Sequence, residues 1–395
     1  MTKPLQGIRV LDLGHVLAMP TCTMQLADLG AEVIKIERPG IGDDSRHFGP
    51  FINSESAYFM SVNRNKKSVT LDLKQKEGRE IFKKLVKKSD IIAENYRANT
   101  MKKLNLGYDV LKKINPLVIY ASICCFGHHS VDQQRAGYDT IAQSIGGIMS
   151  ITGYPDGPPT RVGTSVADIF SGSFATIGIL AALYHRNILK EGQYIDISMV
   201  DSVFSVLENA VVRYTATGEI ATRLGNGHAS IAPYDAYETK DGWVVIGAGN
   251  NALWKKLCKA INMEELINNP LYNTNDNRSK NCKQLNSLLT TWTKKKSSRE
   301  IVELLTKAGV PSAEVNTIDK IVQDPNIKLR NMLVEMNHPR AGKVLVANSP
   351  IRLSKNDNNL INPAPKMGEH TEEVLKEILG MTEEEIKELR IKKVI

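Results

Sequence analysis

The first forty or so residues alternate between two hydrophobic patterns, and this alternation restricts the possible folds more than any other feature. Residues 8–13 and 31–37 are short runs rich in branched apolar side chains, and residues 21–29 between them have helical periodicity and end at Gly30. Short branched runs are typical of strands, whereas helices repeat apolar residues every three or four positions. This order predicts a βαβ unit with parallel strands and a right-handed crossover.

The same alternation continues to about residue 125. Residues 68–73, 91–94 and 118–122 are strand-like, and residues 77–88 are helical. We therefore expect an α/β fold with an open sheet of Rossmann type. The glycine-rich dinucleotide fingerprint is absent, because no GxGxxG motif follows the first strand. Such a sheet would have to hold a nucleotide-like ligand by another loop.

The second half of the chain begins with helices of small residues and ends as a separate domain. The first elements are expected at 141–149 (helix), 170–184 (helix) and 193–199 (strand). Polar turns near Arg223 then indicate a linker. Residues 234–239 and 242–246 flank a Lys-Asp-Gly turn, which favours a β-hairpin. Further helices are expected at 251–261, 281–291, 298–308, 371–379 and 382–392.

The length of the chain also requires more than one core. It has 395 residues, of which 42% are hydrophobic, and one core seldom grows to that size. We predict a large Rossmann-like domain formed by residues 1–210 and 335–395. A smaller α+β domain is predicted at 225–325, with linkers at 211–224 and 326–334.

Composition excludes several classes of partner. The net charge is +8, but the basic residues are spread along predicted helices, and no nucleic-acid module is present. No apolar run approaches the length of a membrane helix, the longest being residues 177–184. The five cysteines are scattered without a CxxC pair, which favours free thiols in a reducing cytoplasm and no metal site. We expect His128 and His129 to be a loop pair without a function.

Asp168 follows a loop with Pro158, Pro159 and Gly163 and leads into a helix of small residues. One interpretation is structural: Asp168 would be the N-cap, accepting hydrogen bonds from the first free amides. The other is chemical, since the positive end of a helix stabilises an anion and would keep this carboxylate ionised and directed outward. The two interpretations are compatible.

Motifs along the whole chain resemble one enzyme family. In order they are 16–38, 63–74 (NRNKKSVTLDLK), 94–97 (ENYR), 137–139 (GYD), 223–226 (RLGN), 232–234 (APY), 364–365 (AP) and 368–371 (GEHT). Each motif alone is weak, but the ordered set is specific. The chain resembles the class III coenzyme A transferases, the CaiB/BaiF family.

This resemblance implies an acyl-CoA:carboxylate CoA-transferase with Asp168 as its catalytic residue. Asp168 would attack the donor thioester to give a mixed anhydride, and the released thiolate would then give an aspartyl-CoA thioester. The acceptor acid would reverse these steps. The resemblance also implies an interlocked homodimer, acyl-CoA and carboxylic acids as substrates, and no permanently bound cofactor.

The family's coenzyme A contacts carry over to individual residues here. The phosphates of coenzyme A need cations along their path. By resemblance Arg38 and Lys74 lie near the nucleotide, and Leu71 lies beside the adenine. The remaining matches are His15 and Val16 near the reacting end, and Asn95, Tyr96, Arg97 and Lys103 along the path.

The substrate end differs from some family members. Leu17 and Met19 stand where some members have Gln and Gly. Together with Tyr138 they favour a pocket less polar than one specific for a dicarboxylate. Gly247, Ala248, Gly249 and Asn250 match a glycine-rich loop that closes over the aspartyl intermediate and whose amides could hold an oxyanion. Without the resemblance they form an ordinary turn between a strand and a helix.

Two other functions are compatible with the same fold. Racemases of this superfamily, such as a 2-methylacyl-CoA racemase, have a His where this chain has Tyr138 before Asp139. A phenol with an ordinary pKa near 10 is poorly suited to moving an α-proton, which favours transfer. The other alternative, a non-catalytic CoA-binding protein, is disfavoured by the intact Asp168.

Overall fold

The computed structural model describes residues 3–356 and 362–395, and contacts divide the chain into two units. The first unit takes the chain up to Ile148, then Arg161–Val212 and Asn326–Ile395. The second takes Met149–Thr160 and Arg213–Pro325. The predicted small domain, 225–325, lies within the second unit.

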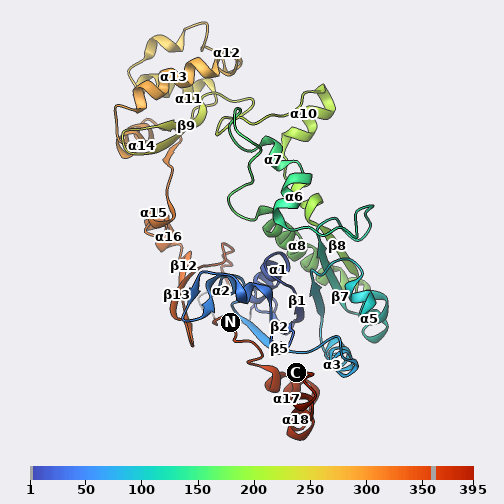
Figure 1. Cartoon of the computed structure of the whole chain (residues 1–395). Coiled ribbons are helices and arrows are strands. Elements are labelled where there is room, and N and C mark those ends of the chain that lie inside the picture. Colours follow the sequence, from blue (N-terminus) through green and yellow to red (C-terminus); the bar gives the residue numbers. More distant parts are fainter. Residues whose placement is uncertain (1–2, 357–361) are drawn as a thin grey trace. The chain divides into compact units, whose positions relative to one another are not determined.

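A six-stranded parallel sheet is the centre of the first unit (Figure 1), so the predicted α/β class with a parallel sheet is confirmed. Its strand order is β5-β2-β1-β6-β7-β8. The strands are β1 Arg9–Leu13, β2 Glu32–Glu37, β5 Lys66–Thr70, β6 Ile91–Glu94, β7 Ile119–Cys124 and β8 Tyr194–Ser198. Chain order therefore runs outward in both directions from the β1–β6 pair.

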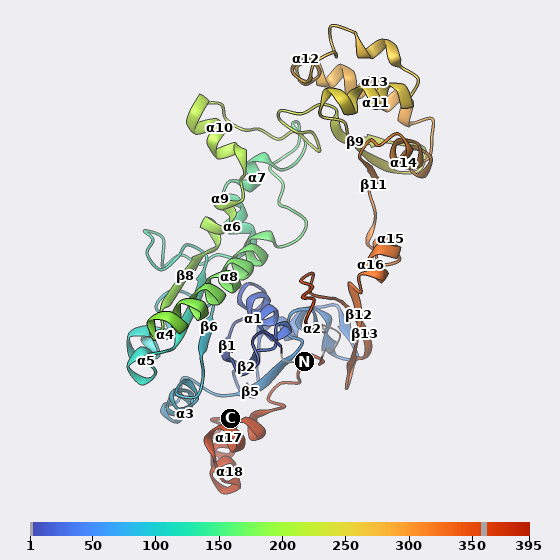
Figure 2. The ribbon, with the colours of Figure 1, turned by 180° about the vertical axis from the view of Figure 1, so that it is seen from behind.

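Helices cover both faces of this sheet because successive strand residues point to opposite sides. Val10 packs in the core beneath α1, α8 and α9, whereas its neighbour Leu11 packs in the core beneath α3, α5, α17 and α18. The second core thus joins both ends of the chain (Figures 1 and 2). The helices are α1 Ala18–Asp28, α8 Val166–Leu189, α9 Met199–Ser205, α3 Lys76–Val86, α5 Tyr108–Ile114, α17 Thr371–Leu379 and α18 Glu383–Ile391.

A small third core in the first unit joins α2 to the antiparallel hairpin β12–β13, with Phe59 packed near Met336. These and the other short elements are η1 Asp44–His47, β3 Phe51–Ile52, β4 Glu55–Ser56, α2 Ala57–Val62, α4 Thr100–Lys103, α6 Asp139–Ile145, β12 Leu333–His338 and β13 Gly342–Ala347. Three helices cross the unit boundaries, namely α7 Ile148–Ile151, α10 Asn209–Thr217 and α16 Pro325–Leu329.

The second unit has an antiparallel sheet in the order β11-β10-β9, which confirms the predicted hairpin. Its core contains Trp254, Leu289 and Ile301. The elements are β9 Tyr234–Glu238, β10 Trp243–Gly247, β11 Ser312–Glu314, α11 Asn251–Ala260, η2 Glu264–Ile267, α12 Asn275–Lys280, α13 Cys282–Thr293, α14 Ser298–Lys307 and α15 Ile318–Ile321.

Two helices differ from their predicted bounds by more than three residues at an end. The helix expected at 141–149 is broken into α6 and α7, because Gly147 adopts a positive φ of 92° that a helix does not allow. The helix expected at 170–184 runs from Val166 to Leu189. At this length α8 is apolar enough to cross a membrane by composition alone, so the expectation that no run approaches that length is wrong. In this structure α8 packs along α1 and β7.

Fully buried charges lie among the strands of the first unit. Lys66 donates from Nζ to Asp12 Oδ2 at 3.0 Å and to Thr23 Oγ1 at 2.8 Å. Lys35 pairs with Asp43 at 2.7 Å. Burial opposes the ionised form of Asp12, but the two lysine ammonium groups outweigh it and lower its pKa. We name Asp12, Lys35, Asp43 and Lys66 the buried ion network.

The buried ion network forms hydrogen bonds with the backbone of the loop between β1 and α1. Asp12 Oδ1 accepts a hydrogen bond from Gly14 N at 2.8 Å, and Lys35 Nζ donates to Gly14 O. Asp43 Oδ1 accepts from Val16 N at 3.1 Å. The loop is therefore held on its backbone by side chains from two strands and from the segment after β2.

We predict that Lys66→Met destabilises the protein by about 3–5 kcal/mol, since it leaves Asp12 as a buried anion with less compensation. The neighbouring Lys67 is the matched control. It pairs with Glu32 and Glu373 at a partly exposed site, so Lys67→Met should cost less than about 1 kcal/mol. The shift of the urea unfolding midpoint measures both. Equal shifts would show that the network contributes no more than a surface pair.

Candidate active site

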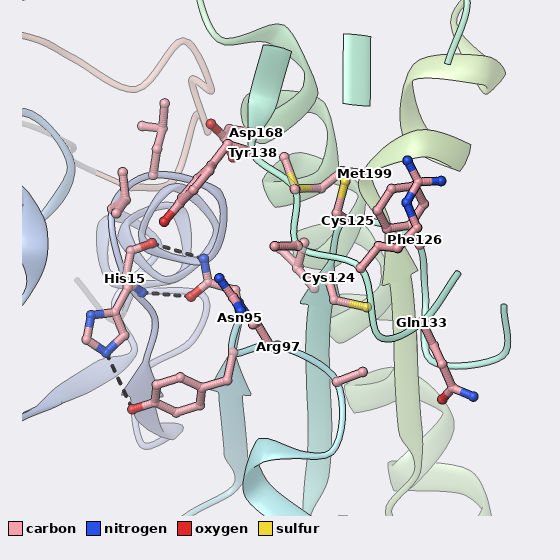
Figure 3. Close-up of a pocket in the computed structure, with 18 of the residues that line it drawn as sticks. His15, Asn95, Arg97, Cys124, Cys125, Phe126, Gln133, Tyr138, Asp168 and Met199 are labelled. Carbon is pink, nitrogen blue, oxygen red and sulfur yellow. Dashed lines mark hydrogen bonds between the residues drawn. The ribbon is translucent and has the colours of Figure 1, made fainter. Parts of the chain in front are cut away.

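A cavity of about 320 Å³ lies at the carboxyl ends of β1, β6, β7 and β8 (Figure 3). Because the chain order diverges between β1 and β6, this is the topological switch point, where open α/β sheets bind their ligands. The volume is within the range of small-molecule sites. The cavity is lined by, among others, His15, Val16, Leu17, Asn95, Tyr96, Arg97, Phe126, Arg135, Tyr138, Asp168 and Met199.

Asp168 lines the cavity from the first turn of α8. The helix begins at Val166 with Ser165 as its N-cap, so the prediction that Asp168 is the N-cap is wrong. Within the residues that the structure describes, no hydrogen-bond donor contacts the Asp168 carboxylate. It is a half-buried carboxylate directed into a cavity and not used to hold the fold together.

Burial raises the pKa of Asp168 to about 7, and the negative charge of Asp139 adds to the effect. This differs from the expectation of a fully ionised group, because the lost hydration outweighs the helix dipole. Near neutral pH, the side chain of Asp168 in the ligand-free enzyme is therefore partly protonated and partly ionised. A perturbed pKa in a cavity is typical of a reactive group.

Asp139 holds the helix that carries Asp168 and does not itself line the cavity. Its Oδ1 accepts from Ala167 N at 2.9 Å, and its Oδ2 accepts from Gln143 Nε2 at 2.7 Å. Gln143 Oε1 in turn accepts from Val162 N at 2.9 Å. Two side chains of α6 thus position the loop and first turn that present Asp168.

The loop after β1 is strained where it meets the cavity. Val16 adopts a φ of 62°, which is unusual for a β-branched residue and costs about 1–3 kcal/mol. Asn95 fixes the backbone of His15, the residue before Val16. His15 N donates to Asn95 Oδ1 at 2.7 Å, and Asn95 Nδ2 donates to His15 O at 2.9 Å (Figure 3). The strain persists because Asn95 and the buried ion network fix this backbone.

The aromatic pair His15 and Tyr96 forms the floor beside this loop. Their ring centroids are 5.3 Å apart, and His15 Nε2 lies 3.4 Å from the Tyr96 hydroxyl. Burial lowers the pKa of His15, and the nearby Lys35 lowers it further. The imidazole is therefore neutral at pH 7 and supplies no positive charge.

The other residues predicted to contact coenzyme A lie outside this cavity. Arg38, Lys74 and Lys103 are exposed. Arg97 is the exception: it is exposed as well, but it lines the cavity. Leu71 is 2% exposed and packs in the core, so its side chain offers no surface to an adenine. The roles of Arg38, Lys74 and Lys103 along the coenzyme A path stay predictions. Met19 is also buried in the core, which leaves Leu17 as the apolar residue of this loop at the cavity.

The predicted loop Gly247, Ala248, Gly249 and Asn250 belongs to the second unit, whereas Asp168 belongs to the first. The amide of Gly247 donates to Pro311 O at 2.9 Å, and that of Ala248 to Pro233 O at 2.8 Å. These two amides cannot hold an oxyanion in this conformation, contrary to the expectation. Asn250 is the N-cap of α11, accepting from Leu253 N at 2.8 Å.

Several cavity residues were missed by sequence reasoning. They are Asp44, Cys124, Cys125, Phe126, Gln133, Arg135 and Met199. Some of these could have been found, because the ends of parallel strands meet at one edge and the predicted strand 118–122 stops just before Cys124. The polar loop residues Gln133 and Arg135 had no such signal.

A second cavity of about 650 Å³ adjoins the first and shares Arg97 and Gln133 with it. Burial raises the pKa of Glu94 on its floor to about 7. Among the described residues, Cys124, His128 and Asp196 form the one group whose atoms lie close enough to hold a metal, all within 4.8 Å. Burial raises the pKa of the Cys124 thiol to about 12. His128 Nε2 and Ser122 Oγ share a hydrogen bond of 2.8 Å.

Comparison with known proteins identifies the family. The model of CoA-transferase family III matches residues 5–371. The chain belongs to CoA-transferase family III. The predicted family and the prediction of a CoA-transferase are thereby confirmed, in preference to a racemase or a non-catalytic binding protein.

Similar proteins match over nearly their whole length. The succinyl-CoA:glutarate CoA-transferase of Mus musculus is 41% identical over 388 residues, covering 98% of this chain and 89% of that one. The succinyl-CoA:mesaconate CoA-transferase of Haloarcula hispanica is 42% identical over 383 residues, covering 94% and 96%. The crystal structure of a CAIB/BAIF family protein from Brucella suis has a TM-score of 0.87 at 38% identity, covering 96% and 100%.

The raised pKa of Asp168 predicts a pH-dependent cost to stability. From its ordinary value of 3.8 up to about 7, the folded enzyme keeps a proton that the unfolded chain has lost, so wild-type stability falls as the pH rises. Asp168→Asn removes this titration. Its thermal midpoint should exceed that of the wild type by a margin that grows from about pH 5 to about pH 7 and then levels off.

Differential scanning fluorimetry across this pH range measures the margin. Asp276→Asn is the matched control, because its carboxylate is 71% exposed and pairs with Lys280 on the surface. That variant should follow the wild type at every pH. A margin for Asp168→Asn that stays constant with pH would show that Asp168 is ionised throughout.

Proposed function

We propose that this CoA-transferase works by covalent relay through Asp168. The ionised carboxylate attacks the thioester carbonyl of the donor, forming a mixed anhydride as the carbon–sulfur bond breaks and CoA thiolate leaves. The thiolate attacks the aspartyl carbonyl of the anhydride, which gives an aspartyl-CoA thioester and the free donor acid. The acceptor carboxylate then attacks that thioester, and the two steps run in reverse to give acceptor-CoA and Asp168.

The observation that best supports this proposal is the state of the Asp168 carboxylate. It has no hydrogen-bond donor among the described residues and points into a cavity at the switch point of the sheet. A poorly hydrated carboxylate is a stronger nucleophile than a solvated one, and half-burial also limits hydrolysis of the intermediates. Asp139 and Gln143 support this role by holding the first turn of α8 in place.

We also propose that the substrates are dicarboxylic acids and their CoA thioesters. The names of several relatives include glutarate, mesaconate, oxalate and malate, which are all dicarboxylates. The sequence favoured a less polar pocket on the basis of Leu17, Met19 and Tyr138. Met19 does not line the cavity, and Gln133 and Arg135 add polar groups to it, so that inference loses its support.

The coenzyme A path is proposed to run along the carboxyl edge of the sheet. His15, Val16, Asn95, Tyr96 and Arg97 would hold its reacting end. The matched cations Arg38, Lys74 and Lys103 are exposed, as a contact to phosphate requires. No permanently bound cofactor is needed for this chemistry.

Trapping of the intermediate tests the relay. Incubation of the enzyme with succinyl-CoA and hydroxylamine should convert the side chain of Asp168 to a hydroxamate, detected by mass spectrometry of its peptide. Asp44 also lines the cavity and serves as an internal control, since its peptide should remain unmodified. Asp168→Ala should keep its affinity for CoA and lose turnover by at least about 10³-fold. Turnover that survives this substitution would remove Asp168 from the mechanism.

We further propose that the protein is an interlocked homodimer in the cytoplasm. The outer face of α8 carries Ile177, Leu180, Tyr184 and Ile188, of which Ile177 is 61% and Tyr184 72% exposed. An apolar stripe of this kind on one helix is typical of an interface. All five cysteines are free thiols, which fits a reducing compartment.

Sedimentation equilibrium should give twice the chain mass of 43.8 kDa. Ile177→Glu combined with Tyr184→Glu should abolish the dimer, because two charges cannot be buried in an apolar contact. Arg299→Glu on the exposed face of α14 is the control for added negative charge and should leave the mass unchanged. A wild-type monomer would contradict the proposal.

A further inference from the structure

Arg135 is a cation in the Asp168 cavity that the coenzyme A contacts do not use. It stands on the loop between β7 and α6 and lines the cavity with Phe126 and Asp168. Its guanidinium lies over the ring of Phe126, with 4.9 Å between its carbon and the ring centroid. This stacking leaves the edge of the planar group free for hydrogen bonds.

The hydrogen-bonding capacity of Arg135 is mostly unused. Its Nη1 donates to Asp132 Oδ2 at 2.8 Å, and no other acceptor contacts it within the described part of the chain. The side chains of this pair are 55% and 39% exposed, and ion pairs in such surroundings contribute little to stability. A carboxylate from a ligand can therefore join or replace Asp132 at low cost.

Arg135 and Asp168 act on the same part of the cavity. The thiol of Cys125 lines the same cavity and responds to both charges: burial raises its pKa to about 11, Arg135 opposes this increase and Asp168 adds to it. Both charged groups are thus near the end of β7. Arg135 and Asp168 line this one cavity together with Cys125 and Phe126, so a short molecule bound in it meets both charged groups.

A dicarboxylate needs such a cation. When it binds, one carboxylate must lie beside the anionic Asp168 and the second brings a further negative charge into a half-buried site, where like charges repel strongly. His15 is neutral here. Arg97 follows the Asn95–Tyr96 segment and also lines the second cavity, which suits it to coenzyme A. Arg135 is the remaining cation among the residues that line this cavity.

We propose that Arg135 binds the distal carboxylate of a dicarboxylic acid whose other carboxylate reacts at Asp168. This inference rests on the proposed function and specifies its substrate class. The flat guanidinium presents paired donors that match the two oxygens of a carboxylate. Arg135 would thereby select dicarboxylates over monocarboxylates of the same length and orient them, without contact to the reacting atoms.

A comparison of two acceptors tests the proposal. With succinyl-CoA as the common donor, kcat/KM is measured for glutarate and for pentanoate, which has the same chain length and one carboxylate. Arg135→Gln should lower the ratio of the glutarate value to the pentanoate value about 10- to 100-fold, as expected for a lost charged hydrogen bond. The donor contributes equally to both values and cancels in their ratio.

Two other variants sharpen the result. Arg135→Lys keeps the charge without the paired donors and should lose less than Arg135→Gln. Arg299→Gln removes a positive charge from an exposed site in the second unit and should leave the ratio unchanged. Glutarate binding to the CoA-saturated enzyme, measured by calorimetry, gives the same comparison without turnover.

The outcomes separate this inference from the covalent mechanism. If Arg135→Gln lowers kcat/KM equally for glutarate and pentanoate, or weakens the binding of CoA itself, Arg135 belongs to the coenzyme A path and the proposal is overturned. If the wild type forms no hydroxamate at Asp168, the relay fails, yet the calorimetric comparison still decides whether Arg135 recognises the second carboxylate.

Discussion

The site depends on four charges buried among the strands of the large sheet. Asp12, Lys35, Asp43 and Lys66 have lost their hydration, and they are stable only because each faces an opposite charge and further donors. Asp12, Lys35 and Asp43 also hydrogen-bond to the backbone of Gly14 and Val16 in the loop after β1. The network therefore fixes the backbone of this loop at the cavity, because the loop cannot move without breaking hydrogen bonds to buried charges on the sheet.

This arrangement explains why a strained residue persists at the centre of the site. Val16 has a positive φ that a β-branched side chain disfavours, and an isolated loop would relax. Here Asn95 and Asp43 hold the residues on and beside it, so relaxation would break buried polar contacts. The loop keeps His15 and Leu17 at the cavity wall, in the position from which a bound thioester would be oriented.

Unlike the charges of the buried ion network, Asp168 does not stabilise the fold. Its carboxylate is half-buried without a hydrogen-bond donor among the described residues, which raises its pKa and lowers the stability of the fold. Asp139, on α6, accepts the hydrogen bond of the Ala167 amide in the first turn of α8, so this amide is satisfied without Asp168. A group that contributes nothing to folding and is held by others that do is typical of an active site.

The sequence by itself determined the α/β class, the hairpin of the second unit and, through its ordered motifs, the family. Those features depend on local periodicity and short motifs, which are legible along the chain. Only the tertiary structure decided that Asp139 supports α8, that Leu71 and Met19 are buried, that two amides of the loop after β10 are engaged, and that Arg135 shares a cavity with Asp168. These facts depend on which distant residues meet, and on how far burial outweighs a helix dipole, and neither is set by neighbours in sequence.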